Sequence, residues 1–236
     1  TYVPIDISAG ALTELTQNLR NELPQLPLKP LAGDYFAALK EHTSNKETLR
    51  RVVLFLGSNV GNFSQKETVQ FFQQLSSHLD EGDLLLLGFD LQKHPATILA
   101  AYNDAQGVTR AFNLNLLRRI NHELQADFDL LQFDHYPIYD PPTGEARSYI
   151  VSRVEQTVHL AALDETVFFE AGECIHTETS RKYTLSQMQD LAQDSCLQPL
   201  ASFTDGKGYF ADMLLEVRKC TPDFPEAERQ AVASQW

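Results

Sequence analysis

Short apolar runs alternate with helix-spaced apolar positions along the first ninety residues of the chain. Each run is too short for an ordinary helix and predicts a strand, and residues 52–56 are apolar throughout, as in a central strand covered on both faces. The predicted strands cover residues 2–7, 31–34, 52–56 and 84–90, and the predicted helices cover residues 8–23, 37–42 and 65–79. This β-α-β-α-β order predicts an α/β fold with parallel strands and right-handed crossovers.

The pattern changes after residue 90. A long helical region over residues 95–124, broken near Gly107, precedes alternating segments that predict antiparallel strands. These strands cover residues 133–139, 147–153, 156–162 and 166–170, and a helix through residue 194 with strands at 198–204 and 209–217 ends the pattern. We therefore predict a sheet domain from residues 1–92 and 183–220, an α+β insertion over 93–182, and a tail, 221–236, without assigned structure.

A polar, glycine-bent loop follows the apolar run at residues 52–56. Gly57 ends the strand, and Ser64 with Glu67 three residues later has the capping-box pattern of a helix start. The loop over residues 57–62 therefore lies at the carboxyl end of a strand. Open α/β sheets bind small molecules at that edge, so the loop is the first candidate site.

Composition excludes several classes of partner. The formal net charge is -13 and the pI is about 4.9, which opposes attraction to nucleic acid or to anionic membranes. No apolar run is long enough to span a bilayer. The three cysteines suit neither a disulfide framework nor a zinc site, which predicts free thiols and a cytoplasmic location. His176 and Glu178 lack the paired cysteines of a zinc deaminase, so no metal is expected.

Five segments in consistent order carry a family resemblance. They are Val3-Pro-Ile-Asp-Ile-Ser8, Leu54-Phe-Leu-Gly-Ser-Asn-Val-Gly-Asn62, Gly88-Phe-Asp90, Ala101-Tyr-Asn-Asp-Ala-Gln-Gly-Val-Thr-Arg-Ala-Phe-Asn113 and Ile175-His-Thr-Glu-Thr-Ser-Arg-Lys-Tyr183. Together they resemble the histidine-specific S-adenosylmethionine-dependent methyltransferases, whose best-known members make trimethylhistidine for ergothioneine biosynthesis. The resemblance runs from Tyr2 to about Val217.

The resemblance implies a class I methyltransferase (Rossmann-like) sheet with a substrate-recognition insertion. It also implies S-adenosylmethionine as the methyl donor and the α-nitrogen of L-histidine as the acceptor. Family members carry a helical region and a first sheet strand with a glycine-rich cofactor loop ahead of the matching part, and this sequence begins after both. We therefore expect an N-terminally incomplete sheet in a fragment of a complete enzyme, with unpaired backbone groups in mid-sheet.

The cofactor contacts come from the resemblance. Asp6 corresponds to the acid that accepts hydrogen bonds from the ribose hydroxyls. Gly33, Asp34 and Tyr35 correspond to the turn beside the adenine, and the carbonyl of Gly57 would face the methionine part and the substrate amine. Each position also has a local interpretation, because Asp residues often cap turns and a glycine can simply end a strand.

The substrate contacts are implied in the same way. Asn62 and Tyr102 would hold the amino-acid end of histidine as neutral partners, and we predict them as the catalytic residues because they orient the amine. Glu178 and Ser180 would grip the imidazole, the acid accepting an N–H and the hydroxyl either donating to or accepting from the other nitrogen. Without the resemblance, Tyr102 fits helix packing and residues 177–182 are an ordinary charged turn.

Two other functions remain open from the sequence. An N-methyltransferase for another amino acid, such as tryptophan, would keep the fold but would replace the Glu178 and Ser180 grip by apolar groups. A non-catalytic binding module without the cofactor loop is the second. In each case we expect a small-molecule ligand and a monomer.

Overall fold

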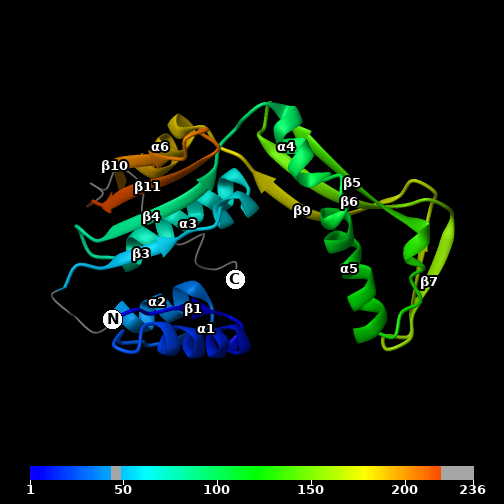
Figure 1. Ribbon diagram of the computed structural model, residues 1–236, viewed down its shortest axis with the longest axis horizontal. Helices are drawn as coiled ribbons and strands as arrows, with labels where there is room; N and C mark the ends of the chain where they lie inside the picture. Colours follow the sequence, from blue (N-terminus) through cyan, green and yellow to red (C-terminus); the bar gives the residue numbers. More distant parts are fainter. Residues whose placement is uncertain (44–48, 219–236) are drawn as a thin grey trace, which may run out of the picture.

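The computed structural model describes residues 1–43 and 49–218 of the chain. Figure 1 shows two parts joined side by side, a sheet with helices and an insertion with its own sheet and helices. Each part has its own hydrophobic cluster. The first is centred on the sheet and includes Phe72, Leu85 and Met213, and the second includes Leu117, Phe133 and Ile150.

The main sheet has four strands in the order β10-β11-β4-β3. The strands are β3 (Val52–Phe55), β4 (Leu84–Asp90), β10 (Leu197–Thr204) and β11 (Phe210–Val217). As predicted, β3 and β4 are parallel, and β11 runs antiparallel to both of its neighbours. The terminal hairpin therefore extends the parallel pair into a mixed sheet.

Two helices cover one face of this sheet and contact each other. They are α3 (Gln65–His78) and α6 (Leu185–Gln193), and both begin with the capping boxes that the sequence predicts, at Ser64 and Thr184. Each cap satisfies orphan backbone N–H groups of the first turn and so fixes where the helix begins. The buried side chains of both helices belong to the main hydrophobic cluster.

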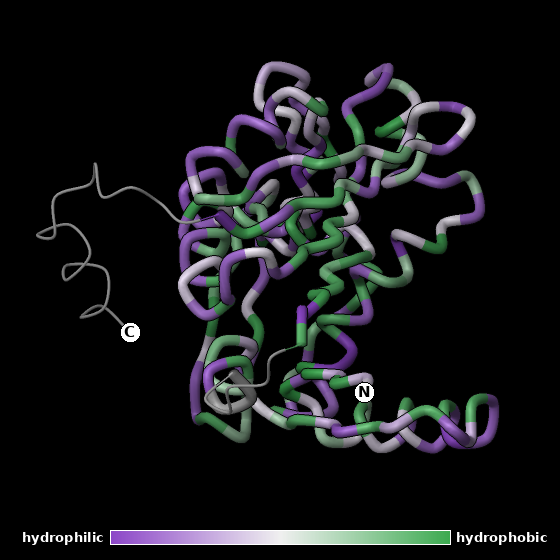
Figure 2. The backbone as a smooth tube through the Cα atoms, turned by 90° about the vertical axis from the view of Figure 1, so that its left-hand side faces the viewer, coloured by the Kyte–Doolittle hydropathy of each residue, from purple (hydrophilic) through white to green (hydrophobic). Residues whose placement is uncertain are grey.

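The N-terminal residues form a separate small unit. Its elements are β1 (Ile5–Asp6), α1 (Ala9–Glu22), β2 (Leu31–Ala32) and α2 (Tyr35–Thr43). The strands pair in parallel, as predicted, but they form their own two-stranded sheet. In Figures 1 and 2 this unit lies below the main sheet. A cavity of about 830 Å³ is lined by residues of both β1 and β3.

The prediction that residues 52–56 form a strand covered on both faces is wrong in this structure. Val53 and Phe55 pack against the main cluster, whereas Val52 and Leu54 are 55% and 51% exposed. The reason is that α3 and α6 cover only the face of Val53 and Phe55. Among the described residues β3 pairs only with β4, and its other side borders the cavity. The apolar run is typical of a buried central strand, but β3 is an edge strand among the described residues.

The insertion contains two helices, a three-stranded sheet and a hairpin. The helices are α4 (Pro95–Tyr102) and α5 (Val108–Glu123), and the strands are β5 (Phe133–Asp140), β6 (Glu145–Ser152), β7 (Gln156–Leu160), β8 (Glu165–Phe169) and β9 (Cys174–Arg181). The antiparallel sheet has the order β5-β6-β9, β7 pairs with β8, and both helices pack on β5 and β6. The strand β9 is absent from the sequence prediction, which treats residues 177–182 as a charged turn.

Three further features concern the cysteines, possible metal ligands and membrane-spanning helices. Cys174 is a free, exposed thiol, as expected, but the expectation is wrong for Cys196, which is disulfide-bonded. No group of side chains that could hold a metal ion occurs among the described residues. Within the same residues, no helix combines the length and the apolar character needed to cross a membrane.

Candidate functional site

The strand β9 joins the insertion to the main sheet at the carboxyl end of β4 (Figure 1). The amide of Tyr183 donates to the carbonyl of Asp90 at 3.1 Å, and the amide of Gln92 donates to the carbonyl of Tyr183 at 2.9 Å. The side chain of Gln92 donates to the carbonyl of Lys182 at 3.2 Å. These backbone bonds hold residues 180–183 against the edge where an α/β sheet binds ligands.

The predicted loop after β3 packs on the same part of β9. It forms the short helix η1 (Asn59–Asn62), which follows two residues with positive φ, Gly57 at 78° and Ser58 at 64°. The Ser58 hydroxyl accepts a hydrogen bond from the Asp90 amide at 3.0 Å, which ties the ends of β3 and β4 together. Ser58 thus has a structural partner and not the arrangement of a nucleophile.

A close backbone approach brings η1 to β9. A Cβ atom at Gly61 would lie 2.7 Å from the carbonyl oxygen of Arg181 and 3.4 Å from the Ser180 hydroxyl. Only glycine fits there without displacing the backbone. Asn62, the next residue, is exposed. Gly61, and not Asn62 itself, is the residue that approaches Ser180.

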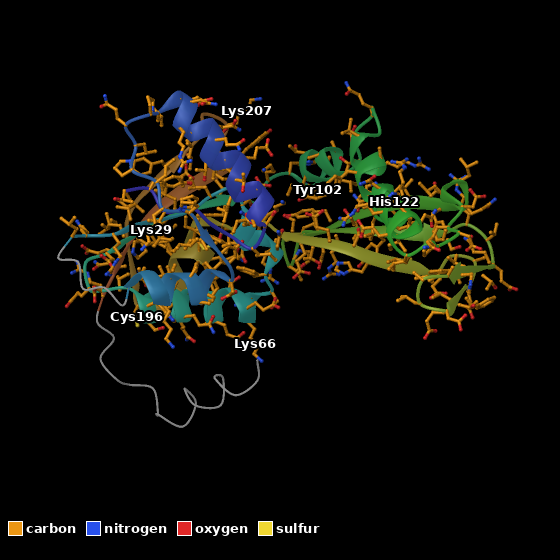
Figure 3. The ribbon with its side chains drawn as sticks, turned by 90° about the horizontal axis from the view of Figure 1, so that it is seen from below. Lys29, Lys66, Tyr102, His122, Cys196 and Lys207 are labelled. Carbon is orange, nitrogen blue, oxygen red and sulfur yellow. The ribbon has the colours of Figure 1, made fainter. Side chains whose placement is uncertain are left out.

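A buried lysine connects two of the predicted substrate residues. Lys182 is 3% exposed, and its ammonium donates to the Tyr102 hydroxyl at 2.7 Å and to the Ser180 hydroxyl at 2.8 Å. It also pairs with Asp90 at 3.1 Å, and the other Asp90 oxygen pairs with Lys93 at 2.5 Å. Figure 3 shows Tyr102, at the end of α4, between the two parts of the molecule. The structure therefore brings Tyr102 and Ser180 together.

The sheet register places Glu178 on the same face as Ser180. Cross-strand partners share a face, and β6 pairs Ala146 with Ser180 and Ser148 with Glu178. Glu178 is half-buried, and its side chain has no hydrogen bond to another described residue. Its carboxylate is therefore not committed to a partner within the described chain.

Tyr139 is a site residue that the sequence prediction missed. It pairs with Ala146 across β5 and β6, which places it on the face of Ser180 and Glu178. Burial raises the pKa of the Tyr139 hydroxyl, and the charges of Lys182 and Asp90 act on it with opposite signs. Lys182 was missed as well, although its position two residues after Ser180 repeats the strand period and could have indicated it.

The predicted cofactor residues lie in the N-terminal unit and at the end of β3. One Asp6 oxygen accepts from the Ser8 amide at 2.7 Å, and one Asp34 oxygen accepts from the amides of Phe36 and Ala37 at 2.9 and 3.1 Å. The local capping interpretation is thus correct for one oxygen of each acid. The second oxygen of each has no hydrogen bond among the described residues.

The cofactor residues are only partly assembled. The Gly33 amide donates to the Asp6 carbonyl at 3.0 Å, which joins the two carboxyl ends of β1 and β2. The ring of Tyr35 meets the ring of Phe55 edge-on, with centroids 6.2 Å apart. Asp6 and Tyr35 line the cavity between β1 and β3. Gly57 does not line it, and neither does Lys182 with its partners Tyr102 and Ser180.

The sequence model of the family described as "Histidine-specific methyltransferase, SAM-dependent" matches residues 1–217. The chain belongs to this family. The family predicted from the sequence is therefore confirmed. The described residues build an α/β fold whose mixed sheet has an antiparallel hairpin beside parallel strands, as predicted.

Named relatives give the extent of the similarity. The histidine N-alpha-methyltransferase of Mycolicibacterium smegmatis (strain ATCC 700084 / mc(2)155) is 36% identical over 210 residues, which are 89% of this chain and 64% of that protein. The L-tryptophan methyltransferase trpM of Psilocybe serbica is 28% identical over 169 residues, 70% of this chain and 46% of that protein. A solved S-adenosylmethionine-dependent methyltransferase from Clostridium acetobutylicum ATCC 824 aligns with 92% of this chain and 75% of its own, at 12% identity and a TM-score of 0.46.

Proposed function

We propose that this chain carries the substrate site of an enzyme that transfers methyl groups from S-adenosylmethionine to the α-nitrogen of L-histidine. Three transfers would give trimethylhistidine, as in ergothioneine biosynthesis. The observation that carries the proposal is the family match over residues 1–217. The chain spans 64% of the length of the mycobacterial relative, so the activity of the whole protein is part of the proposal.

The charges around Tyr102 suit the amino-acid end of the substrate. Two cations, Lys182 and Lys93, surround one carboxylate, that of Asp90. The excess positive charge attracts a substrate carboxylate at Tyr102. It also disfavours the ammonium form of the nearby amine, and the reaction needs the neutral amine, whose lone pair attacks the methyl group.

The polar face of β9 suits the imidazole. Glu178 has a free carboxylate that can accept the ring N–H, and Ser180 lies two residues along the same face. A ring without nitrogens would leave such groups unpaired. Sites built to pair polar atoms reject such analogues by about 10⁴-fold.

The residues available for the methyl donor fit in part. Asp6 and Asp34 each keep one carboxylate oxygen outside the local turns, and Gly57 turns the backbone at the end of β3. Asp6, Gly33, Asp34, Tyr35 and Gly57 would hold the donor. When bound, S-adenosylmethionine supplies an activated methyl group, so the chain's residues need only orient the amine and exclude water.

Calorimetry and mass spectrometry test the proposal. The protein is titrated with L-histidine and with L-tryptophan, with S-adenosylhomocysteine present, and methylated products are then sought after incubation with S-adenosylmethionine. We expect the protein to bind histidine but not tryptophan, and to form products that carry one to three methyl groups. Preference for tryptophan would favour the second function, and histidine binding without product would favour a non-catalytic module.

Methylation of tryptophan is the second candidate function, because one relative is a fungal L-tryptophan methyltransferase. Against it stand buried polar groups at the end of β9 and just after it, because Ser180 and Lys182 are 6% and 3% exposed and form a polar wall. A large apolar ring would gain little from such a wall. The non-catalytic module is favoured by the edge of β3, which has no second partner strand among the described residues.

A further inference from the structure

The ammonium of Lys182 occupies one lone pair of two hydroxyl groups and leaves each with an O–H to donate. A lysine ammonium has three donors and no acceptor, so each of its contacts requires an acceptor on the other side. Its partners are the Tyr102 hydroxyl, the Ser180 hydroxyl and the Asp90 carboxylate. Both hydroxyl oxygens are therefore acceptors toward Lys182, and each keeps one O–H to donate elsewhere.

Neither O–H has a second partner among the described residues. Ser180 is 6% exposed, so its hydroxyl hydrogen cannot be left to bulk water. A buried donor without an acceptor costs free energy, and a ligand acceptor would recover it. The geometry of the free site thus calls for an acceptor atom opposite each hydroxyl.

The backbone holds the lysine in this position. The Lys182 amide donates to the Gly144 carbonyl at 2.8 Å, and its carbonyl accepts from the Gln92 side chain at 3.2 Å. The ammonium also lies 5.0 Å from the ring centroid of Tyr102. The main-chain bonds fix the start of the side chain, and its burial, at 4% exposure, keeps the ammonium from turning away from the two hydroxyls.

We infer that Lys182 is a specificity-determining residue that makes Ser180 and Tyr102 hydrogen-bond donors, so that the site takes a neutral heteroaromatic ring through a ring nitrogen acceptor. This inference rests on the proposed function and deepens it. Ser180 donates to the unprotonated ring nitrogen, Glu178 accepts from the ring N–H, and Tyr102 donates to the substrate carboxylate. The cation beside Ser180 also opposes a positively charged ring.

The test compares two ligands and three proteins by calorimetry, with S-adenosylhomocysteine present. The ligands are L-histidine and β-(pyrrol-2-yl)alanine, which keeps a ring N–H but lacks the acceptor nitrogen. The proteins are the unchanged chain, Lys182→Met and the control Lys93→Met. Lys93 shares Asp90 but contacts neither hydroxyl, so the control removes an equal charge from the same cluster.

We expect the unchanged chain and Lys93→Met to prefer histidine over the pyrrole by roughly tenfold to a hundredfold. Loss of the Lys93 charge should weaken both ligands to the same extent, because both carry the same carboxylate. In Lys182→Met the preference should fall toward one, because the Ser180 hydroxyl no longer has to accept from the ammonium and can turn its O–H to another acceptor when the ring nitrogen is absent. A purely structural role of Lys182 would weaken both ligands equally and would overturn the inference. An unchanged preference for histidine in Lys182→Met would overturn it as well.

The ligand comparison does not depend on the variant. If Lys182→Met does not fold, the two affinities of the unchanged chain still test the inference, because equal affinity for histidine and the pyrrole would overturn it. If the unchanged chain binds no histidine, the proposed function fails, and the inference fails with it. Histidine binding with no preference over the pyrrole overturns the inference alone.

Discussion

At the scale of single residues, the site combines a free carboxylate with hydroxyls that already have a cationic partner. Glu178 has no hydrogen bond among the described residues, whereas Ser180 and Tyr102 share Lys182. Resemblance alone predicts Glu178, Ser180 and Tyr102, but it did not reveal Lys182. A lysine is almost never fully buried, so a charged segment is normally taken as exposed.

Glu178 gives the first prediction at this scale. Glu178→Ala should weaken histidine binding by roughly tenfold to a hundredfold, because the substrate N–H loses a charged acceptor. Glu178→Gln should lose less, since the amide oxygen still accepts. Calorimetry measures both, with Glu170→Ala as the control at an exposed position after β8. Unchanged affinity in Glu178→Ala would show that this carboxylate does not touch the ligand.

At the scale of elements, the site depends on how closely the loop after β3 approaches β9. The carboxyl end of β3, the capping box of α3 and the parallel pairing with β4 all follow from the sequence. The strand β9 does not, because Cys174–Arg181 is polar on both faces after Ile175 and shows no hydrophobic period. Its pairing with β6 is decided by tertiary context, which a single sequence does not show.

Gly61 tests this approach. Gly61→Ala should place a Cβ atom 2.7 Å from the Arg181 carbonyl and push η1 away from β9. We expect a loss of about 1–3 kcal/mol in the free energy of unfolding. Histidine binding should weaken as well, because Asn62 moves with the loop. Urea unfolding and calorimetry measure the two effects.

The matched control for this prediction is Gly206→Ala. Gly206 has no atom within 4 Å of the added Cβ and lies in the turn between β10 and β11. The control should therefore leave unfolding and binding close to those of the unchanged chain. Equal behaviour of the two variants would mean that the loop accommodates a side chain at Gly61 and that the close approach is not required.

At the scale of the whole molecule, the insertion and the sheet are separate clusters held together at one junction. Arg181 lies there, and its guanidinium donates to Glu145 of β6 at 2.6 Å and to Gln65 of α3 at 3.4 Å. The alternation of strands and helices predicts both parts from the sequence. It does not predict the open face of β3, because an apolar run indicates that a strand tends to be buried and not that a neighbour is present to bury it.

The ion pair between Arg181 and Glu145 makes the stability of the protein depend on pH. The hydrogen bond from Arg181 holds the pKa of the Glu145 carboxyl below its ordinary 4.5, with burial opposing and Arg147 assisting. A carboxyl with a lowered folded pKa contributes its full stability above the unfolded pKa, near pH 4.5. That stability is lost as the pH falls through the lower folded value.

Glu145→Gln therefore isolates this contribution. The difference in unfolding free energy between the unchanged chain and Glu145→Gln should be positive and constant above pH 4.5 and should shrink below it. Other carboxyls with lowered pKa values, such as Asp134 and Glu67, are present in both proteins, so their effects cancel in the difference. Urea unfolding between pH 3 and 7 measures it, with the exposed Glu165→Gln as the control. A difference that does not vary with pH would show that Arg181 and Glu145 add no charge pairing between β9 and β6 at the junction.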